Sequence, residues 1–399
     1  MGPIAQKSAL ILCGDYMEDY EVIVPFFMLQ SLGVRVDCVS PGKRSGDKCF
    51  TAIHDYLGFG LDTELQGHFF TLNANYDDVA VESCDALIIP GGRFTELLCT
   101  DDKLVSTATH KCTAFTSLKT HVCGSGPLRG KQCTAFTSFK PIVELAGGIW
   151  WEQPGVESAL DITACLMDGN LVSSIGWPGH GEYTRVLLES IGAKISRSHR
   201  NSVLVVLADY AEDYEVNVPF RALQGLGCRV DAVCPSKKKG ESSLTAIHDD
   251  EGAQICTEKR GHNFVVNANW SDISADDYDF LVLPGGRSPE LLVINEKVVS
   301  LIKEFADKGK IIAAIGQGKW VVAAAGALKP WNEGNCEVAG GKVVESGGCV
   351  AHGKLVTASG WPCSSSFLNR DNKRPWFICG VLKWGRLASF SLCLCDVEQ

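Results

Sequence analysis

The sequence lacks the features of a membrane-bound or exported protein. No apolar segment reaches the roughly 20 residues that a membrane-spanning helix needs. The N-terminus runs almost directly from Met1–Lys7 into the apolar segment Ala9–Cys13, without the charged start, apolar stretch and cleavage site of a secretory signal. These absences favour a soluble cytoplasmic protein and are compatible with nuclear localisation as well.

Basic charge is also in short supply. The chain has 37 Lys and Arg against 47 Asp and Glu, which gives a net charge of −10. A surface for nucleic acid or anionic lipid concentrates Lys and Arg, and the sole basic run, Lys237–Lys239, is typical of a solvated loop. We therefore expect no nucleic-acid partner and no membrane partner.

Metal-binding and redox motifs are scarce, because the sequence has neither a paired CxxC set nor an HExxH motif. It does have 18 cysteines, spread over a long chain without an export signal. Such a distribution favours reduced thiols over disulfides. We interpret the close spacing of Cys393 and Cys395 as chance, and the sequence predicts neither a metal nor a cofactor.

An internal repeat dominates the 399 residues. The segment Asp15–Val22 returns as Asp209–Val216, an offset of 194 residues. The same offset relates three further pairs: Thr51–Asp55 with Thr245–Asp249, Asn73–Asn75 with Asn267–Asn269, and Pro90–Arg93 with Pro284–Arg287. A period this long indicates two whole domains and not a solenoid. We predict repeat 1 over residues 1–196 and repeat 2 over residues 197–399, with a divergent tail from about residue 363.

Each repeat has the pattern of a parallel sheet, with short apolar runs, Gly-rich turns and helical stretches. The predicted strands are Ala9–Cys13, Val34–Val39 and Ala86–Ile89 in repeat 1, and Val203–Leu207, Arg229–Val233, Phe280–Leu283 and Ile311–Ile315 in repeat 2. Helices are predicted over Tyr183–Ile191, over Glu296–Lys308 and in the Ala-rich stretch that ends at Gly326. The fold class is therefore α/β, with two tandem flavodoxin-like doubly wound domains.

Ligands of such sheets bind beyond the carboxyl ends of the strands, which directs attention to three places. The first is an acidic turn and the second is a Pro-Gly-Gly-Arg turn; their candidate residues are Glu18, Gly91 and Gly92 in repeat 1, and Glu212, Gly285 and Gly286 in repeat 2. The third is the strand-turn-helix at residues 311–326, where a nucleophile elbow would form. The first two places also have a purely structural interpretation, because acids stabilise helix N-termini and glycines form tight turns.

These motifs, with Ala313-Ala314-Ile315 before an Ala-rich helix, resemble the ThiJ/PfpI superfamily. The duplication resembles its plant tandem-domain branch, which includes cofactor-free glyoxalases. The resemblance implies a class I glutamine amidotransferase-like fold and a small aldehyde ligand. It also implies a cysteine thiolate at the elbow, a glutamate that shares a proton with the thiol, and an oxyanion held by the Gly-Gly turn.

Both elbows depart from the family's Cys-His-Gly pattern. In repeat 2, Gly316 stands at the cysteine position and Gln317 at the histidine position, so this elbow has no nucleophile. In repeat 1, counting forward from Ser106 puts the elbow near Cys123, whereas counting back from Gly126–Leu128 puts it near Thr116-Ser117. The segment Cys112–Ser117 also recurs as Cys133–Ser138, which suggests that a local duplication overwrote the ancestral helix.

Histidines near the motifs have open interpretations. His180, in Trp177–Glu182, matches a family segment and has no counterpart after Trp361-Pro362 in repeat 2. His54 and His248 each precede an aspartate, an arrangement that suits a structural histidine about as well as a site residue.

Two functional hypotheses remain. The first is a pseudoenzyme with an intact fold and pocket, acting through binding, oligomerisation or a stress-associated protective role. The second is a weak cofactor-independent glyoxalase or deglycase that uses Cys123 with Glu18, or Glu212 as a base without a nucleophile. The sequence favours the first, with the two repeats pairing as an intrachain pseudo-dimer and homo-oligomers as a further expectation.

Overall fold

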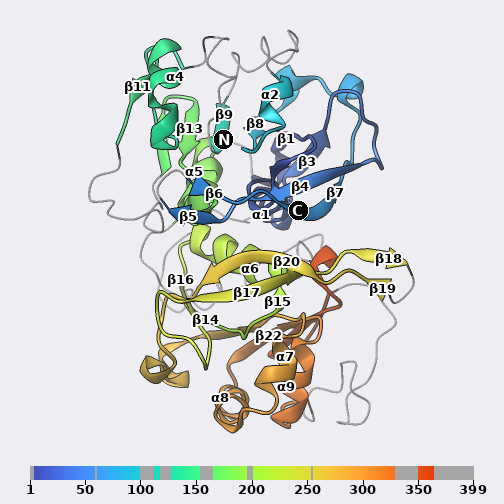
Figure 1. The fold of residues 1–399 in the computed structure, drawn as a ribbon. Coiled ribbons are helices and arrows are strands. Elements are labelled where there is room, and N and C mark those ends of the chain that lie inside the picture. Colours follow the sequence, from blue (N-terminus) through green and yellow to red (C-terminus); the bar gives the residue numbers. More distant parts are fainter. Residues whose placement is uncertain are drawn as a thin grey trace. The chain divides into compact units, whose positions relative to one another are not determined.

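The structure is a computed structural model, and it describes residues 4–58, 61–98, 112–116, 126, 128–152, 165–195, 201–252, 255–328 and 349–363. The chain divides into two compact units, whose described parts lie within residues 1–195 and 196–391 (Figure 1). Unit 1 contains repeat 1 and unit 2 contains repeat 2.

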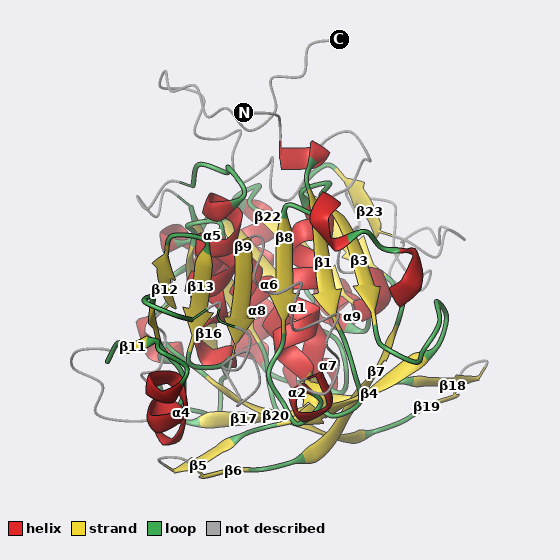
Figure 2. Ribbon diagram, turned by 90° about the horizontal axis from the view of Figure 1, so that it is seen from above, coloured by secondary structure: helices red, strands yellow, loops and turns green. Residues whose placement is uncertain are grey.

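The main sheet of unit 1 has six strands in the order β12-β13-β9-β8-β1-β3, which lie side by side in Figure 2. Their bounds are β1 (Ser8–Leu12), β3 (Arg35–Val39), β8 (Ala86–Ile89), β9 (Cys112–Thr116), β12 (Cys165–Asp168) and β13 (Leu171–Ser174). All neighbouring pairs are parallel except β12 with β13. The parallel order 3-1-8-9 is that of a doubly wound domain.

Smaller elements complete unit 1. A three-stranded sheet contains β2 (Met17–Glu18), β4 (Lys48–Ile53) and β7 (Leu65–Thr71), and two pairs are formed by β5 (Tyr56–Gly58) with β6 (Leu61–Asp62) and by β10 (Gln132–Cys133) with β11 (Ile149–Trp150). The helices are α1 (Asp19–Ser31), α2 (Thr95–Leu98), α4 (Lys140–Leu145) and α5 (His180–Ser190). Helix α1 packs against β3 and α5, and α5 also covers β12 and β13.

Unit 2 repeats this plan with the sheet order β16-β14-β21-β22-β24-β23. The strands are β14 (Ser202–Val206), β16 (Arg229–Val233), β21 (Phe280–Leu283), β22 (Ile311–Ile315), β23 (Cys349–His352) and β24 (Leu355–Ala358). The second sheet contains β15 (Ala211–Glu212), β17 (Ser242–Ile247) and β20 (Lys259–Val265), and β18 (Asp250–Gly252) pairs with β19 (Ile255–Cys256). The helices are α6 (Asp213–Gly225), α7 (Ser288–Leu292), α8 (Glu296–Asp307) and α9 (Gly318–Ala324).

The core lies on the central strands, as their apolar sequences predict. Every residue of β8, β21 and β22 is buried, because helices cover both faces of a parallel sheet. The expected strands are confirmed to within one residue at their ends, and the helix predicted over Glu296–Lys308 is α8. The doubly wound α/β fold is therefore confirmed in both units.

One segment of repeat 1 differs from its expected character. The segment Thr107–Leu128 does not have the pattern of a helix followed by a strand, yet Cys112–Thr116 forms β9 at the centre of the sheet. It pairs with β8 on one side and with β13 on the other. Strand propensity depends on what the neighbours can pack against, and the small buried side chain of Ala114 suits this central position.

Candidate functional site

Glu18 and Glu212 lie at the start of the first helix of each repeat, where both act as N-caps. The Oε2 atom of Glu18 accepts the backbone N–H of Glu21 at 2.8 Å, and Glu212 accepts that of Glu215 at the same distance. Each carboxylate is only 2% exposed. The capping role of an acid at a helix N-terminus is therefore realised in both repeats.

A second acid lies one helical turn further on and contacts the Gly-Gly turn. Glu21 Oε2 accepts the backbone N–H of Gly91 at 2.5 Å, and Glu215 Oε2 accepts that of Gly285 at 2.7 Å. Glu21 and Glu215 were not among the site residues that the sequence motifs predicted. The signal was nevertheless present, because both belong to the repeated acidic motif and lie three residues after Glu18 and Glu212, on the same side of the helix.

The Gly-Gly turns are built for close backbone approach. Gly92 has φ 93° and Gly286 has φ 67°, which is the left-handed region. A Cβ on Gly92 would lie 2.3 Å from the carbonyl oxygen of Tyr16, and one on Gly286 would lie 2.4 Å from the backbone nitrogen of Glu212. Only glycine fits either position, and the turn holds the N–H of Gly91 or Gly285 against its glutamate.

The elbow of repeat 2 lies directly beside Glu215. Gly316 has φ 50°, and a Cβ at this position would lie 3.0 Å from Oε2 and 3.1 Å from Oε1 of Glu215. The Oε1 atom of Gln317 lies 3.0 Å from where a Cβ of Gly285 would stand. The elbow therefore presents only the hydrogen atoms of Gly316 toward Glu215 and the carboxamide of Gln317 toward Gly285, and neither group can attack a carbonyl carbon.

Burial and charge place Glu215 near its titration point at neutral pH. Burial and then the negative charge of Glu212 raise the pKa of Glu215 to about 8. The backbone N–H of Gly285, the ammonium of Lys319 and the backbone N–H of Trp361 oppose this rise, because each stabilises the carboxylate. A carboxyl group with such a pKa is suited to donating or accepting a proton near pH 7.

The register of β9 locates the corresponding position in repeat 1. Ile89 pairs with Phe115, and the equivalent residue Leu283 pairs with Ala314. Thr116 therefore corresponds to Ile315, so the residue after the strand, Ser117, corresponds to Gly316. This register agrees with the backward count from Gly126–Leu128. Cys123, the candidate nucleophile, comes six residues later, and both Ser117 and Cys123 lie outside the described residues.

The structure shows what lies next to each of the three candidate histidines. His180 is fully buried at the start of α5, where its ring stacks on Tyr183 with centroids 5.1 Å apart. The backbone carbonyl of His54 accepts the indole N–H of Trp177 at 2.8 Å, and His248 accepts that of Trp361 at 3.0 Å. These contacts tie the segment after the last parallel strand to the second sheet in each repeat.

A buried polar cluster that the sequence did not predict recurs in both repeats. Nδ1 of His68 lies 2.8 Å from Oδ2 of Asp19, and the hydroxyl of Thr51 donates to Oδ1 of the same aspartate at 2.5 Å. In repeat 2, His262 lies 2.8 Å from Asp213, and Thr245 donates to that aspartate. Each Asp and His is fully buried, so the hydrogen bonds offset the cost of removing these groups from water.

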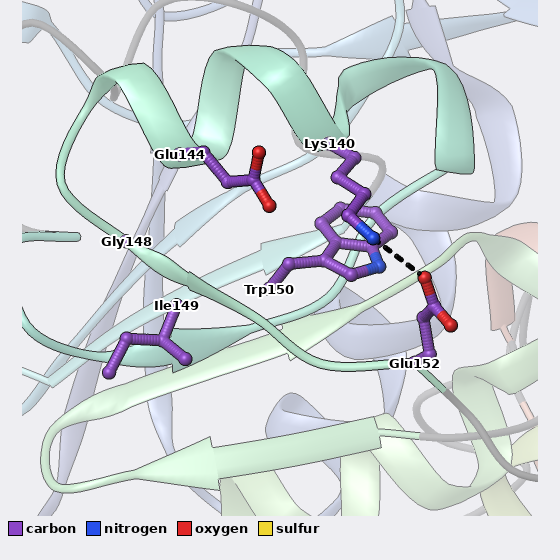
Figure 3. A pocket seen from close by; sticks show the side chains of 6 residues that line it. All are labelled: Lys140, Glu144, Gly148, Ile149, Trp150 and Glu152. Atoms are coloured by element: carbon purple, nitrogen blue, oxygen red, sulfur yellow. Dashed lines mark hydrogen bonds and ion pairs between the residues drawn. The ribbon is translucent and has the colours of Figure 1, made fainter.

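A separate hollow of about 500 Å³ lies between α4 and β11 (Figure 3). It is lined by Lys140, Glu144, Gly148, Ile149, Trp150 and Glu152. The ammonium of Lys140 lies 2.9 Å from Oε1 of Glu152, and this ion pair crosses the hollow. None of the predicted site residues lines it, so it is distinct from the glutamate sites.

The structure also bears on the state of the cysteines and on membrane-spanning helices. Within the described parts of the chain, nine cysteines are free: Cys13, Cys38, Cys49, Cys84, Cys133, Cys165, Cys228, Cys234 and Cys349. Among the described residues, no helix is long and apolar enough to cross a bilayer.

Comparison with known proteins identifies the family. The model of the "DJ-1/PfpI family" matches residues 7–190 and 201–370. "DJ-1 protein homolog E" of Arabidopsis thaliana is 53% identical, with 90% of this chain and 94% of the relative covered. "DJ-1 protein homolog F" of the same plant is 52% identical, with coverages of 92% and 97%. "Deglycase PfpI" of Pyrococcus furiosus is 32% identical, over 32% of this chain and 67% of the relative. Two tandem matches that together span most of the sequence show that this chain belongs to the DJ-1/PfpI family.

Proposed function

We propose that this chain is a binding protein for small aldehydes. In this proposal, repeat 2 has lost the cysteine chemistry that the resemblance to the ThiJ/PfpI superfamily implies. The observation that carries the proposal is Gly316, which stands at the elbow with φ 50° and faces the Glu215 carboxyl. A glycine has no side chain that can form a thiohemiacetal, so a carbonyl ligand at this elbow cannot react with the residue that occupies it.

The remaining parts of the site support binding. The Glu215 carboxyl is buried and hydrogen-bonded to Gly285, and its pKa of about 8 lets it offer a proton to a carbonyl oxygen at neutral pH. Such a group recognises an aldehyde without forming a covalent bond. We extend the proposal to a stress-associated protective role in the cytoplasm, in which the protein sequesters reactive carbonyl compounds.

The alternative is a weak glyoxalase or deglycase that uses Cys123 with Glu18. The Pyrococcus furiosus relative is named a deglycase, which favours this second function. Against it stand the N-cap role of Glu18 and the strand register, which matches Ser117 and not Cys123 to the elbow.

Turnover of methylglyoxal and glyoxal by the full chain separates the two. We would compare the wild type with Cys123→Ala, Glu18→Ala and Glu21→Ala, and with a heat-denatured control. The proposal expects no turnover above the control, together with saturable aldehyde binding in calorimetry. Turnover that is lost in Cys123→Ala would establish the enzyme and reject the proposal. Absence of both turnover and binding would also reject it.

A further inference from the structure

Lys319 is a buried amine at the elbow of repeat 2, and the function proposed above makes no use of it. It lies three residues after Gly316, in the first turn of α9, and only 7% of it is exposed. Its Nζ atom lies 3.4 Å from the carbonyl oxygen of Ala358 at the end of β24. Long charged side chains are rarely buried to this degree, which calls for an explanation of this lysine.

The amine and the Glu215 carboxyl share one small region. A Cβ on Gly360, two residues after Ala358, would lie 3.5 Å from Oε1 of Glu215. The Lys319 charge also acts on the Glu215 carboxyl. Three glycines lie next to that carboxyl, namely Gly285, Gly316 and Gly360. Much of the immediate environment of the carboxyl is therefore backbone and not side chain.

We propose that Lys319 is an imine-forming residue for small aldehydes, and that it supplies the nucleophile which Gly316 does not. This inference rests on the proposed aldehyde binding at the same site. A lysine withdrawn from water and within electrostatic reach of a carboxyl group is an effective nucleophile toward carbonyl carbon. Glu215 is a suitable proton partner, because burial and Glu212 keep its affinity for a proton high.

The chemistry balances within the pair. In the fraction of molecules in which Glu215 is ionised, the Lys319 ammonium gives a proton to the carboxylate, which leaves a neutral amine and a carboxylic acid. The nitrogen lone pair then attacks the aldehyde carbon, and the amine proton moves to the carbonyl oxygen to give a neutral carbinolamine. Glu215 protonates the carbinolamine hydroxyl, which leaves as water. The products are a protonated imine on Lys319 and the Glu215 carboxylate, so the total charge is unchanged.

Reductive trapping tests the proposal on the full chain. Propanal at limiting concentration, with cyanoborohydride as hydride donor, converts an imine into a stable propyl-lysine that peptide mass spectrometry can locate. We expect Lys319 to be labelled about tenfold faster than the 61%-exposed Lys303 on α8. Equal or slower labelling of Lys319 would overturn the proposal and leave it as an electrostatic partner of Glu215.

Matched variants keep the test decisive. Lys319→Arg preserves the positive charge and should remove only the fast label, whereas Lys303→Arg should leave it unchanged. Glu215→Gln should slow labelling at Lys319, because the carbinolamine then lacks its proton donor. If the Lys319→Arg variant is still labelled as fast, at another lysine, the assignment of the imine to Lys319 is rejected. Reductive trapping detects the imine without any turnover. If turnover depends on Cys123, the proposed function is rejected, but the labelling of Lys319 still shows whether this lysine forms an imine.

Discussion

At the scale of single residues, the elbow of repeat 2 combines a left-handed backbone with crowding. Gly316 has φ 50° and its missing Cβ would lie 3.0 Å from Glu215, whereas Gly309 has φ 62° and open space around it. Gly309 is therefore a natural control that shares the left-handed backbone but not the crowding.

We expect Gly316→Ala to lower the free energy of unfolding by about 2–3 kcal/mol and Gly309→Ala by about 1 kcal/mol. The first loss includes displacement of the Glu215 carboxyl, and the second reflects only the left-handed backbone. Urea denaturation of both variants measures the difference. Equal losses would mean that Glu215 moves aside at no cost.

Tyr16 and Tyr210 provide a second residue-scale prediction. Each has φ 65°, which is unusual for a bulky side chain, and each ring is about half exposed. Replacing Tyr210 by glycine removes the strain with little loss of packing, so we expect a gain of about 1 kcal/mol in unfolding free energy. Tyr210→Ala keeps the strain and should give no gain. A loss in Tyr210→Gly would show that the ring contributes more than the strain costs.

The titration of Glu215 makes stability depend on pH. Its pKa rises from 4.5 to about 8 on folding, so the folded state holds a proton that the unfolded state has released between these values. Stability should therefore fall as pH rises from about 5 to 8, by at most about 4 kcal/mol. Glu215→Gln should show a flatter profile of melting temperature over this range. Parallel profiles for the two proteins would contradict the shift.

At the scale of elements, β9 shows how context selects structure. The same hexapeptide occurs twice: Cys112–Thr116 is a central strand, while in the second copy Cys133 ends β10 and Thr137–Phe139 form a 3-10 helix. The first copy adds hydrogen bonds to β8 and β13 along its whole length, an opportunity that the second copy lacks.

A charged substitution tests the placement of β9. Ala114 is fully buried between two parallel neighbours, so Ala114→Asp should cost about 3 kcal/mol or more. Met167 on the edge strand β12 is 47% exposed, and Met167→Asp should change stability by less than about 0.5 kcal/mol. Equilibrium unfolding in urea compares them. A small effect at Ala114 would place the hexapeptide outside the core.

At the scale of the whole molecule, the duplicated Thr-Asp-His clusters predict matched behaviour of the two repeats. Asp19→Ala removes the buried carboxylate beside the His68 ring, and Asp213→Ala removes the one beside His262. Thr51 and Thr245 then keep only the backbone carbonyl of that histidine as an acceptor. Each substitution should cost about 3–5 kcal/mol, because breaking a buried pair strands its partner. Hydrogen exchange resolves the loss by repeat. A large cost in one repeat alone would show that the clusters have diverged.

The sequence by itself determined the fold and the duplication. Apolar runs of four or five residues that end in glycine turns specify a covered parallel sheet, and β8, β21 and β22 are buried as this pattern requires. The glycine at position 316 was equally visible, because it depends on residue identity alone.

Only the tertiary structure decided which acid faces the elbow. Glu18 and Glu21 lie on one side of a helix and share a motif, so composition and spacing do not distinguish a capping carboxylate from one that reaches the Gly-Gly turn. The burial of Lys319 and the register of β9 were likewise decided there. Both depend on which strands lie beside them, a long-range pairing that local sequence patterns do not encode.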